Sequence, residues 1–409
     1  MKTLVELLES SVQKYADNPY ILEKVTDSYK ALTYKETREQ VYLVAAGLLV
    51  LGIRKGDRVA LISESRTDWV ISELGILYTG AVNVPMSILL KEGADLKFRL
   101  DHSEARWVII SGKNLDKINS IKRELKKLEK VILLDSQDTY DTDEIFMGDV
   151  KSMGEEYLRN NFEKFLETKN SVRPDDYANI CYTSGTTADP KGIILSHRNY
   201  TANIEQALSL MDVPEWWTTL LILPWDHSFA HTVGIYIMMA SGASLAAVQS
   251  SKSYLDSLKN IPGNIIETRP VFLLSAPSLA KNLRKGIEKG IRDKGKLVEK
   301  LFNHALRIAY RYNGIGWDKG KGFKVFLKPL YKLYDIILFK KIRASFGGRL
   351  KFFFGGAALL DIELQRFFYA IGIPMLQGYG LSEAAPVISG NTESRHKLGS
   401  SGSVVSDLE

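Results

Sequence analysis

The chain has 409 residues, of which 45% are hydrophobic and 25% are charged, and its formal net charge is +6 at pH 7. These proportions are typical of a folded globular protein and exclude the disordered and collagen-like classes. A chain of this length is expected to bury a large core and to form two or three domain-sized units.

The N-terminal residues show an amphipathic helical pattern. Glu6, Glu9 and Asp17 interrupt it, whereas a signal peptide has a basic start and an unbroken apolar stretch. The most apolar stretch, residues 233–248, is shorter than the ~20 residues of a membrane span and predicts a buried helix followed by a strand. Cys181 is the only cysteine, and its apolar neighbours predict a packed thiol. These features predict a cytoplasmic protein.

Helical and strand-like patterns alternate from the beginning of the chain, which predicts a layered α/β fold with largely parallel sheets flanked by helices. Residues 151–176 form a charged stretch that we interpret as a soft boundary between subdomains. The predicted helices cover residues 3–15, 34–51 and 67–78, and the predicted strands cover residues 31–34, 58–63, 83–85, 107–110 and 131–134.

A run of hydroxyl residues and glycines, TSGTTADPKG, directly follows a predicted buried strand at residues 180–182. Small residues let backbone N–H groups approach phosphate oxygens, hydroxyl groups donate hydrogen bonds, and Lys191 adds a positive charge. The run therefore predicts a site for a nucleotide triphosphate, with an ordinary surface turn as the alternative. It is not a Walker loop, because Pro190 and Gly192 flank the lysine where that loop has Gly and Ser or Thr.

The longer segment YTSGTTADPKGIILSH resembles the signature of the adenylate-forming superfamily, with Ala188 at a position where the family usually has glycine. FFFGGAALL resembles the strand and turn that place backbone against adenine in that superfamily, and LQGYGLSEAAPVIS resembles its second diagnostic motif. The resemblance covers almost the whole chain. It implies the α/β fold of the N-terminal domain of these enzymes, with a smaller β subdomain.

The resemblance also implies roles for single residues. Tyr379 would stack on adenine, Ser382 would donate to the α-phosphate, and Glu383 would hold Mg²⁺ together with Thr183. A carboxylate beside a polyphosphate needs a cation between them, although Glu383 read alone would be a solvated surface charge. The implied catalytic residues are Lys191, His227, Ser382 and Glu383, and the implied ATP-binding residues are Thr183, Ser184, Gly185, Thr186, Thr187, Lys191, Gly355, Gly356, Ala357, Gln377, Gly378, Tyr379, Gly380 and Ser382.

Two segments point to the acyl substrate. Residues 277–355 resemble a basic helical insertion of the long-chain fatty acyl-CoA synthetases, which short-chain synthetases and luciferase lack. LPWDHSFAHTVGIYIMMASGASL resembles the segment that contributes the acyl pocket, and pockets of this kind are mostly apolar. The alternative for His227 is a helix cap or a core histidine. The implied acyl-pocket residues are His227, Phe229, Val233 and Gly234.

The implied reaction is the activation of a long-chain fatty acid by Mg-ATP to an acyl-adenylate, followed by acyl transfer to coenzyme A. It would depend on positioning and charge neutralisation and not on a protein nucleophile. Two alternatives stay open: an acyl-AMP ligase or acyl-carrier-protein synthetase, and a nucleotide- or acyl-binding protein without turnover. The family has a C-terminal lid domain after a hinge, and Ser406–Glu409 resemble the last strand before it. We therefore expect residues 1–409 to be the N-terminal domain alone, with slow turnover unless a lid is supplied.

Charge is distributed unevenly along the chain. Residues 281–351 contain 20 Lys and Arg against 5 Asp and Glu, a net charge of +15, so the rest of the chain carries a net charge of −9. The basic helical insertion, at about residues 281–345, predicts contact with an anionic membrane, here the inner face, because each nearby Lys or Arg contributes about 1 kcal/mol. The alternatives are a solvated helical face and a subunit contact in a homodimer. Nucleic acid is not an expected partner, since no nucleic-acid-binding motif is recognisable.

Overall fold

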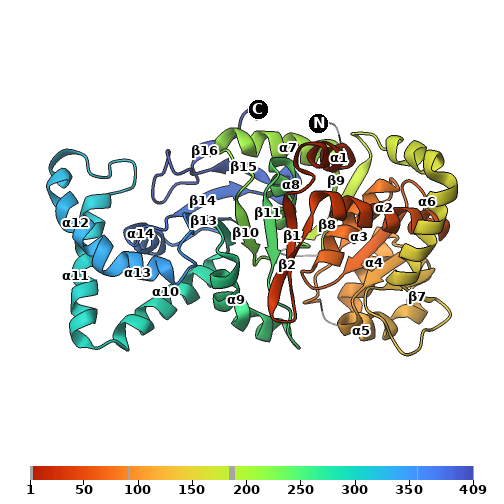
Figure 1. Ribbon diagram of the computed structural model, residues 1–409, viewed down its shortest axis with the longest axis horizontal. Coiled ribbons are helices and arrows are strands. Elements are labelled where there is room, and N and C mark those ends of the chain that lie inside the picture. Colours follow the sequence, from red (N-terminus) through yellow and green to blue (C-terminus); the bar gives the residue numbers. More distant parts are fainter. Residues whose placement is uncertain (1–2, 91–92, 184–188, 357, 409) are drawn as a thin grey trace.

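The computed structural model describes residues 3–90, 93–183, 189–356 and 358–408. The chain forms two sheets that lie side by side, with helices packed around them (Figure 1). This arrangement confirms the predicted α/β fold. Among the described residues, every helix is too short or too polar to cross a bilayer.

The first half of the chain builds most of a seven-stranded sheet. Its strand order is β7-β6-β5-β3-β4-β8-β9, and its neighbouring strands from β7 to β8 are parallel, whereas β8 and β9 form an antiparallel pair. The strands are β3 (Arg58–Ile62), β4 (Val82–Pro85), β5 (Trp107–Ile110), β6 (Lys130–Leu133), β7 (Glu144–Phe146), β8 (Tyr177–Thr183) and β9 (Lys191–Ser196), and the helices are α2 (Tyr34–Val50), α3 (Thr67–Tyr78), α4 (Ala94–Ser103), α5 (Leu115–Asn119) and α6 (Met147–Asn170).

The second sheet has nine strands in the order β16-β15-β14-β13-β12-β10-β11-β1-β2. Its strands are β1 (Pro19–Val25), β2 (Ser28–Thr33), β10 (Thr218–Leu221), β11 (Ser244–Ala247), β12 (Phe272–Ser275), β13 (Phe352–Gly355), β14 (Met375–Gly380), β15 (Val387–Gly390) and β16 (Ser403–Val404). Its longer helices are α1 (Leu4–Tyr15), α7 (His197–Leu210), α9 (Tyr254–Thr268), α10 (Pro277–Arg292), α11 (Lys296–Asn313) and α14 (Ile362–Ala370), and its short ones are η3 (Ala230–Tyr236), α8 (Ile237–Ser241), η4 (Gly322–Leu327), α12 (Lys328–Tyr334), η5 (Asp335–Phe339), α13 (Lys340–Ala344) and η6 (Ser382–Ala384).

The predicted elements of the N-terminal third are present, with ends that differ by a few residues. The helix predicted over residues 34–51 begins at Tyr34, where Thr33 and Glu36 form a reciprocal capping box. Residues 233–248 form a buried helix followed by β11, as predicted, and Cys181 is a buried free thiol. The antiparallel strands β15 and β16 extend the edge of the larger sheet.

Two features of the chain path could not be read from the sequence. Strand β1 was not predicted. Although β1 lies near the N-terminus, it pairs with β11, a strand of the nine-stranded sheet that comes much later in the chain. Residues 151–176, the predicted soft boundary, lie in α6 and the turn after it, and α6 packs along α2. The chain instead passes from one sheet to the other through α7, after β9.

A buried polar cluster joins the layers around the two sheets. Glu73 on α3 and His231 on η3 form an ion pair with an Oε1–Nε2 distance of 2.8 Å, and both side chains are fully buried. The same Glu73 oxygen accepts hydrogen bonds from Tyr236 at 2.8 Å and from Asn83 at 3.0 Å. Burial opposes protonation of His231, but the charge of Glu73 together with the hydrogen bonding of Glu73 and Cys181 outweighs it and raises the pKa of His231 to about 10.

We expect Glu73→Gln to lower the free energy of unfolding by about 3 kcal/mol, because removing one partner of a buried pair leaves the other uncompensated. The matched control is Glu267→Gln, which breaks the Lys24–Glu267 surface pair and should change stability by less than about 1 kcal/mol. Urea denaturation of both variants at pH 7 measures the difference. Equal effects would show that the Glu73–His231 pair does not stabilise the contact between the layers.

The pair also gives stability a defined pH dependence. Because the folded pKa of His231 lies near 10 and an unfolded histidine titrates near 6.5, its contribution is complete below about pH 6.5 and is lost as pH rises through about 10. Stability of the natural chain should therefore fall more steeply between pH 7 and pH 9.5 than stability of the Glu73→Gln variant. If the stability of the two proteins changed with pH in parallel, this result would contradict a protonated His231 in the folded state.

Candidate active site

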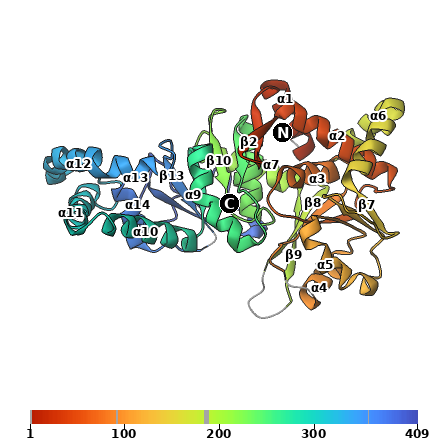
Figure 2. The same cartoon turned by 60° about the horizontal axis from the view of Figure 1, so that its bottom comes forward.

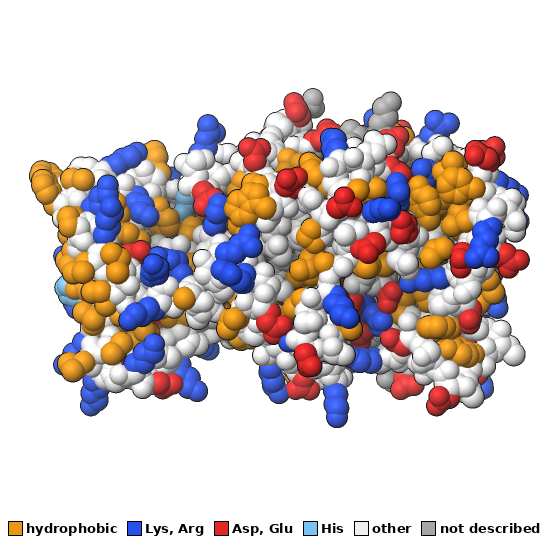
Figure 3. All heavy atoms as spheres, viewed as in Figure 1, with side chains coloured by type: hydrophobic (Ala, Val, Ile, Leu, Met, Phe, Trp, Pro, Cys, Tyr) orange, Lys and Arg blue, Asp and Glu red, His pale blue; other side chains and the backbone are white. Residues whose placement is uncertain are grey.

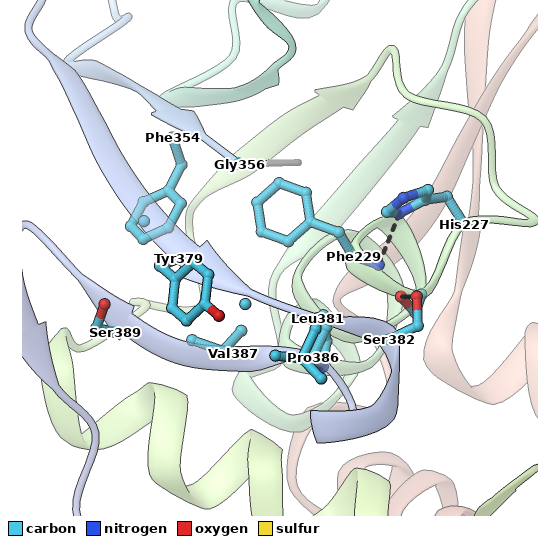
Figure 4. Close-up of a pocket in the computed structure, with 13 residues that line it drawn as sticks. His227, Phe229, Phe354, Gly356, Tyr379, Leu381, Ser382, Pro386, Val387 and Ser389 are labelled. Atoms are coloured by element: carbon cyan, nitrogen blue, oxygen red, sulfur yellow. Dashed lines mark hydrogen bonds between the residues drawn. The ribbon is translucent and has the colours of Figure 1, made fainter. Parts of the chain in front are cut away.

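A cavity of about 210 Å³ lies where the carboxyl ends of β13 and β14 meet the start of helix η3 (Figure 4). The carboxyl ends of parallel strands at a sheet edge are the usual place for a ligand in an α/β fold. The residues that line the cavity come from three separate segments of the chain: His227, Ser228, Phe229, Phe354, Gly356, Gly378, Tyr379, Gly380, Leu381, Ser382, Pro386, Val387 and Ser389.

The wall formed by β14 combines an aromatic ring with closely packed backbone. Tyr379 is 55% exposed, so one face of its ring is free to stack on a planar group. A Cβ atom at Gly380 would lie 2.0 Å from the carbonyl oxygen of Pro386, and one at Gly356 would lie 3.3 Å from the ring of Phe229. Glycine at these two positions therefore lets backbone line the cavity.

The nucleotide segment and the predicted acyl segment meet at two hydroxyl groups. The side-chain oxygens of Ser228 and Ser382 lie 3.0 Å apart. Beside them, the backbone N–H of Phe229 donates to Nδ1 of His227 at 3.2 Å, which caps the start of the helix (Figure 4). His227 therefore lines the cavity and caps a helix at the same time. Because Nδ1 accepts this bond, the proton of the neutral ring lies on Nε2.

Two effects keep the ring of His227 neutral. Desolvation in the cavity lowers the pKa of His227 below its usual value, and the positive charge of the nearby His231 lowers it further. A neutral imidazole can donate one hydrogen bond from Nε2 without placing a fixed positive charge beside the substrate. This property suits a residue that orients a carboxylate and does not form a permanent ion pair with it.

The hairpin of β8 and β9 brings the predicted phosphate-binding lysine to the same side of the molecule. Thr183 and Lys191 are paired residues at the end of this hairpin, and β9 contacts η6, which contains Ser382 and Glu383. The side chains of Lys191 and Glu383 are exposed, and Thr183 is partly buried. Ser184, Gly185, Thr186, Thr187 and Ala357 were also predicted to bind ATP and lie outside the described residues.

The predicted acyl-pocket residues divide between two neighbouring cavities. His227 and Phe229 line the larger cavity, whereas Val233 lines a second cavity of about 40 Å³ whose walls are almost entirely apolar. Phe354 and Val387 belong to both walls. Gly234 lines neither cavity: a Cβ atom there would lie 2.4 Å from Leu221, so this glycine lets η3 approach β10.

Gln377 differs from the other predicted ATP-binding residues, because its side chain is buried and bonded within the protein. Its Oε1 accepts from the backbone N–H of Leu360 at 2.9 Å, and its Nε2 donates to the carbonyl of Gly378 at 2.6 Å. Asn391 donates to the carbonyl of Gln377 at 2.8 Å. These bonds fix the loop after β13 against β14. Gln377 therefore holds the strands next to the cavity in place and does not line the cavity itself.

Sequence reasoning did not single out several residues of the cavity wall. Ser228 adjoins the predicted His227, and Phe354 lies inside the FFFGGAALL segment, so both were within reach of the motif reading. Pro386, Val387 and Ser389 lie inside LQGYGLSEAAPVIS, but the sequence assigned them no role in the site. They line the cavity because β15 folds back antiparallel to β14, which pairs Tyr379 with Ser389.

The fold is α/β, and its cavity lies where the glycine-rich end of β14 meets the start of an apolar helix, beside the β8–β9 hairpin. Residues 8–409 match the family of AMP-binding enzymes. The chain belongs to this family, and it has the α/β fold of the N-terminal domain of adenylate-forming enzymes.

Individual relatives agree with this assignment. The chain is 29% identical to long chain acyl-CoA synthetase 8 of Arabidopsis thaliana over 87% of its own length and 49% of that protein. It is 27% identical to a chloroplastic long-chain-fatty-acid–[acyl-carrier-protein] ligase of the same plant, over 98% of its own length and 58% of that protein. The chain therefore spans about half the length of the curated relatives that it matches.

A solved structure confirms the fold. The crystal structure of a long-chain-fatty-acid-CoA ligase from Archaeoglobus fulgidus superposes with a TM-score of 0.70 at 17% identity, over the whole of this chain and 69% of that one. At this level of identity the likeness concerns the fold alone.

Gly380→Ala should lower the free energy of unfolding by about 1–3 kcal/mol and weaken nucleotide binding, since the added Cβ forces the backbone of β14 away from Pro386. Gly286→Ala is the matched control. Gly286 lies in α10, and a Cβ atom added there would meet no other atom within 4 Å, so alanine should stabilise by up to about 1 kcal/mol. Thermal unfolding and calorimetric titration with ATP measure both effects. A neutral Gly380→Ala variant would contradict the close approach.

Proposed function

We propose that the protein activates a long-chain fatty acid in two steps. In the first, the fatty carboxylate attacks the α-phosphorus of ATP, which forms an acyl-adenylate and releases pyrophosphate. In the second, the sulfur of coenzyme A attacks the acyl carbon and AMP leaves. The observation that carries this proposal is the 3.0 Å contact between Ser228 and Ser382, because there the nucleotide-binding motif and the apolar helix share one cavity.

The residues of the cavity suit the first step. The ring of Tyr379 stacks on adenine, the backbone around Gly356 and Gly380 lies beside it, and the hydroxyl of Ser382 donates to the α-phosphate. Lys191 neutralises phosphate charge from the hairpin. Nε2 of His227 donates to the attacking carboxylate and holds it in line. Such donors lower the barrier by being positioned in advance and by stabilising developing charge.

Glu383 and Thr183 would hold the magnesium ion of Mg-ATP. A carboxylate and a hydroxyl are hard oxygen ligands, which Mg²⁺ prefers, and the remaining positions are normally filled by phosphate oxygens and water. When bound, Mg²⁺ would neutralise phosphate charge. Within the described parts of the chain, Glu383 makes no ion pair, so its carboxylate is available for this role.

The second, apolar cavity would receive the fatty acyl chain. Its lining consists mainly of aliphatic side chains of α7, of η3 and of α8, together with Phe272 and Phe354. The two cavities measure about 210 Å³ and 40 Å³, less than the ~300–1,000 Å³ of typical ligand sites. Rotation of Phe354, which lies between them, would join them into one channel for a long chain.

A second candidate function is transfer of the acyl group to an acyl carrier protein. It is favoured by the similarity to the chloroplastic acyl-carrier-protein ligase, which covers 98% of this chain. A binding protein without turnover is the remaining alternative. The cytoplasmic location and a homodimer stay predictions.

The direct test is pyrophosphate release by the purified chain with Mg-ATP and palmitate, followed by a comparison of coenzyme A with acyl carrier protein as acceptor. We expect release of pyrophosphate to depend on palmitate, and we expect acyl transfer, which should be slow unless a lid domain is supplied, to favour coenzyme A. Preference for the carrier protein would select the second candidate. ATP binding with no acyl-adenylate, detected by mass spectrometry, would indicate a binding protein.

Lys191→Ala and Glu383→Ala should each weaken Mg-ATP binding by about 10- to 150-fold, because a charge-assisted contact contributes about 1.5–3 kcal/mol. Stability should be nearly unchanged, since both side chains are exposed. Lys126→Ala and Glu156→Ala are the matched controls, because they remove exposed charges from the layer around the seven-stranded sheet. Calorimetry that gives equal affinities for test and control variants would remove Lys191 and Glu383 from the site.

Val233→Phe should impair adenylation of palmitate at least tenfold more than adenylation of butyrate, because the larger ring fills the small apolar cavity. ATP affinity should not change. Val25→Phe, at a valine that is 45% exposed on β1, is the control for the substitution itself. Equal losses for both acids would show that the acyl chain does not enter this cavity.

A further inference from the structure

The end of the molecule farthest from the seven-stranded sheet carries hydrophobic side chains in the open among lysines and arginines (Figures 1 and 3). It consists of η4, α12, η5 and α13, together with the neighbouring α11, and both ribbon views place these elements together at this end (Figure 2). We call residues 321–344 the basic platform. They contain seven Lys and Arg and a single acidic residue, Asp335.

The platform has an outer face that is apolar and basic at once. From α12 to α13 the helix is continuous, and Leu333, Ile336 and Ile337 are 50%, 65% and 40% exposed. Tyr334 and Leu338 between them are buried. Lys332 and Lys340 are exposed one turn to either side of the isoleucines, where the helical period places them on the same face. Lysine side chains can lie along such a surface and keep their charges in water.

Two phenylalanines extend the exposed apolar surface. Phe323 and Phe326, in the 3₁₀ helix η4, are 91% and 78% exposed. Side chains three residues apart in a 3₁₀ helix eclipse one another, so both rings project from the same side. Exposed apolar side chains that gather in one patch, unlike scattered single ones, mark an interaction site.

The surface below the platform is firmly packed, so the exposed side chains do not come from a poorly folded segment. The rings of Tyr312 and Tyr331 stack with centroids 4.8 Å apart. Lys319 lies over the ring of Tyr369 at 4.9 Å and over that of Tyr331 at 5.6 Å. These contacts hold the loop before η4 against α11, α12 and α14.

The charge of the platform is largely uncompensated. Both carboxylate oxygens of Asp335 are bound by Arg343, at 2.6 and 2.9 Å, and Lys324 is paired with Asp318. Lys328, Lys332 and Lys340 form no ion pair with any residue that the structure describes. A partner that binds this face must therefore have an apolar interior beneath a negatively charged surface.

We propose that the basic platform docks on an anionic lipid bilayer, with Phe323, Phe326 and Ile336 inserted among the acyl chains and the lysines on the lipid headgroups. A bilayer offers both properties over a broad surface, whereas nucleic acid presents charge without an apolar layer. Docking is a property of the protein surface beyond the proposed reaction, and it does not require turnover.

The test is co-sedimentation of the full chain with vesicles of phosphatidylcholine alone or mixed with phosphatidylglycerol, at low and at high salt. We expect binding to the anionic vesicles that weakens as salt is raised, with little binding to the neutral ones. Each Lys or Arg near the surface contributes about fivefold to the partition coefficient, from about 1 kcal/mol per residue. Lys332→Glu with Lys340→Glu should therefore lower binding at least about 25-fold.

Matched control variants distinguish an effect of the platform on vesicle binding from an effect of the overall charge or hydrophobicity of the chain. Arg123→Glu with Lys126→Glu makes the same charge change on the layer around the seven-stranded sheet and should leave binding nearly unchanged. Phe323→Ser with Phe326→Ser should lower binding more than tenfold and reduce its resistance to salt. Leu255→Ser, at a leucine on α9 that is 71% exposed, is its control. Thermal unfolding checks that every variant is folded.

Three outcomes would overturn the proposal. The first is equal binding to neutral and anionic vesicles, and the second is equal loss in the platform variants and their controls. The third is binding to duplex DNA or self-association, measured at the same salt, without any binding to vesicles.

Discussion

The buried contact between Glu73 and His231 constrains how the two halves of this protein meet, within a hydrophobic core that both halves share. Burying two charges is expensive, and their attraction compensates for that cost only when the geometry is fixed and further hydrogen bonds are present. Tyr236 and Asn83 supply such bonds to Glu73. The pair therefore tolerates little displacement of η3 relative to α3, and η3 begins directly after the residues that line the cavity. The position of His227, Ser228 and Phe229 depends on this buried contact.

The candidate site is built from short pieces that cannot form it alone. The start of η3 and the turn after β14 contribute polar atoms to the cavity, and the β8–β9 hairpin, from a third segment of the chain, contacts η6 beside them. Close backbone approach, as at Gly380 next to Pro386, lets them converge. Gln377 and Asn391 then fix the loops from behind. A site made in this way can stabilise a charged transition state because its donors are already in place.

The basic platform and the cavity belong to one continuous structural unit. Strand β13, which carries Phe354 and leads to Gly356, follows directly after the helices of the insertion. Helix α14 packs between α11 and β14, so the insertion supports the strand that lines the cavity. An apolar substrate with poor solubility in water would be most concentrated at a membrane surface, and a docked platform would place the cavity in its vicinity.

The sequence by itself determined the class of the fold and predicted part of the candidate cavity, including His227, Tyr379 and Ser382. Alternating apolar patterns predict helices and buried strands because the side-chain period differs between them. The motif around Lys191 and the one around Glu383 predict nucleotide chemistry because few residue combinations suit phosphate binding. Those inferences use only neighbours along the chain.

What only the tertiary structure decided depends on contacts between distant residues. The pairing of β1 with β11 joins residues more than 200 positions apart, and no local pattern specifies it. The Ser228–Ser382 contact, the return of β15 that places Val387 and Ser389 in the wall, and the inward turn of Gln377 have the same origin. In the sequence, Glu73 and His231 are two ordinary polar residues, and nothing there indicates that they are buried against each other. Their shared environment arises only when α3 and η3 pack together, because the free energy of a charge depends on its surroundings in space.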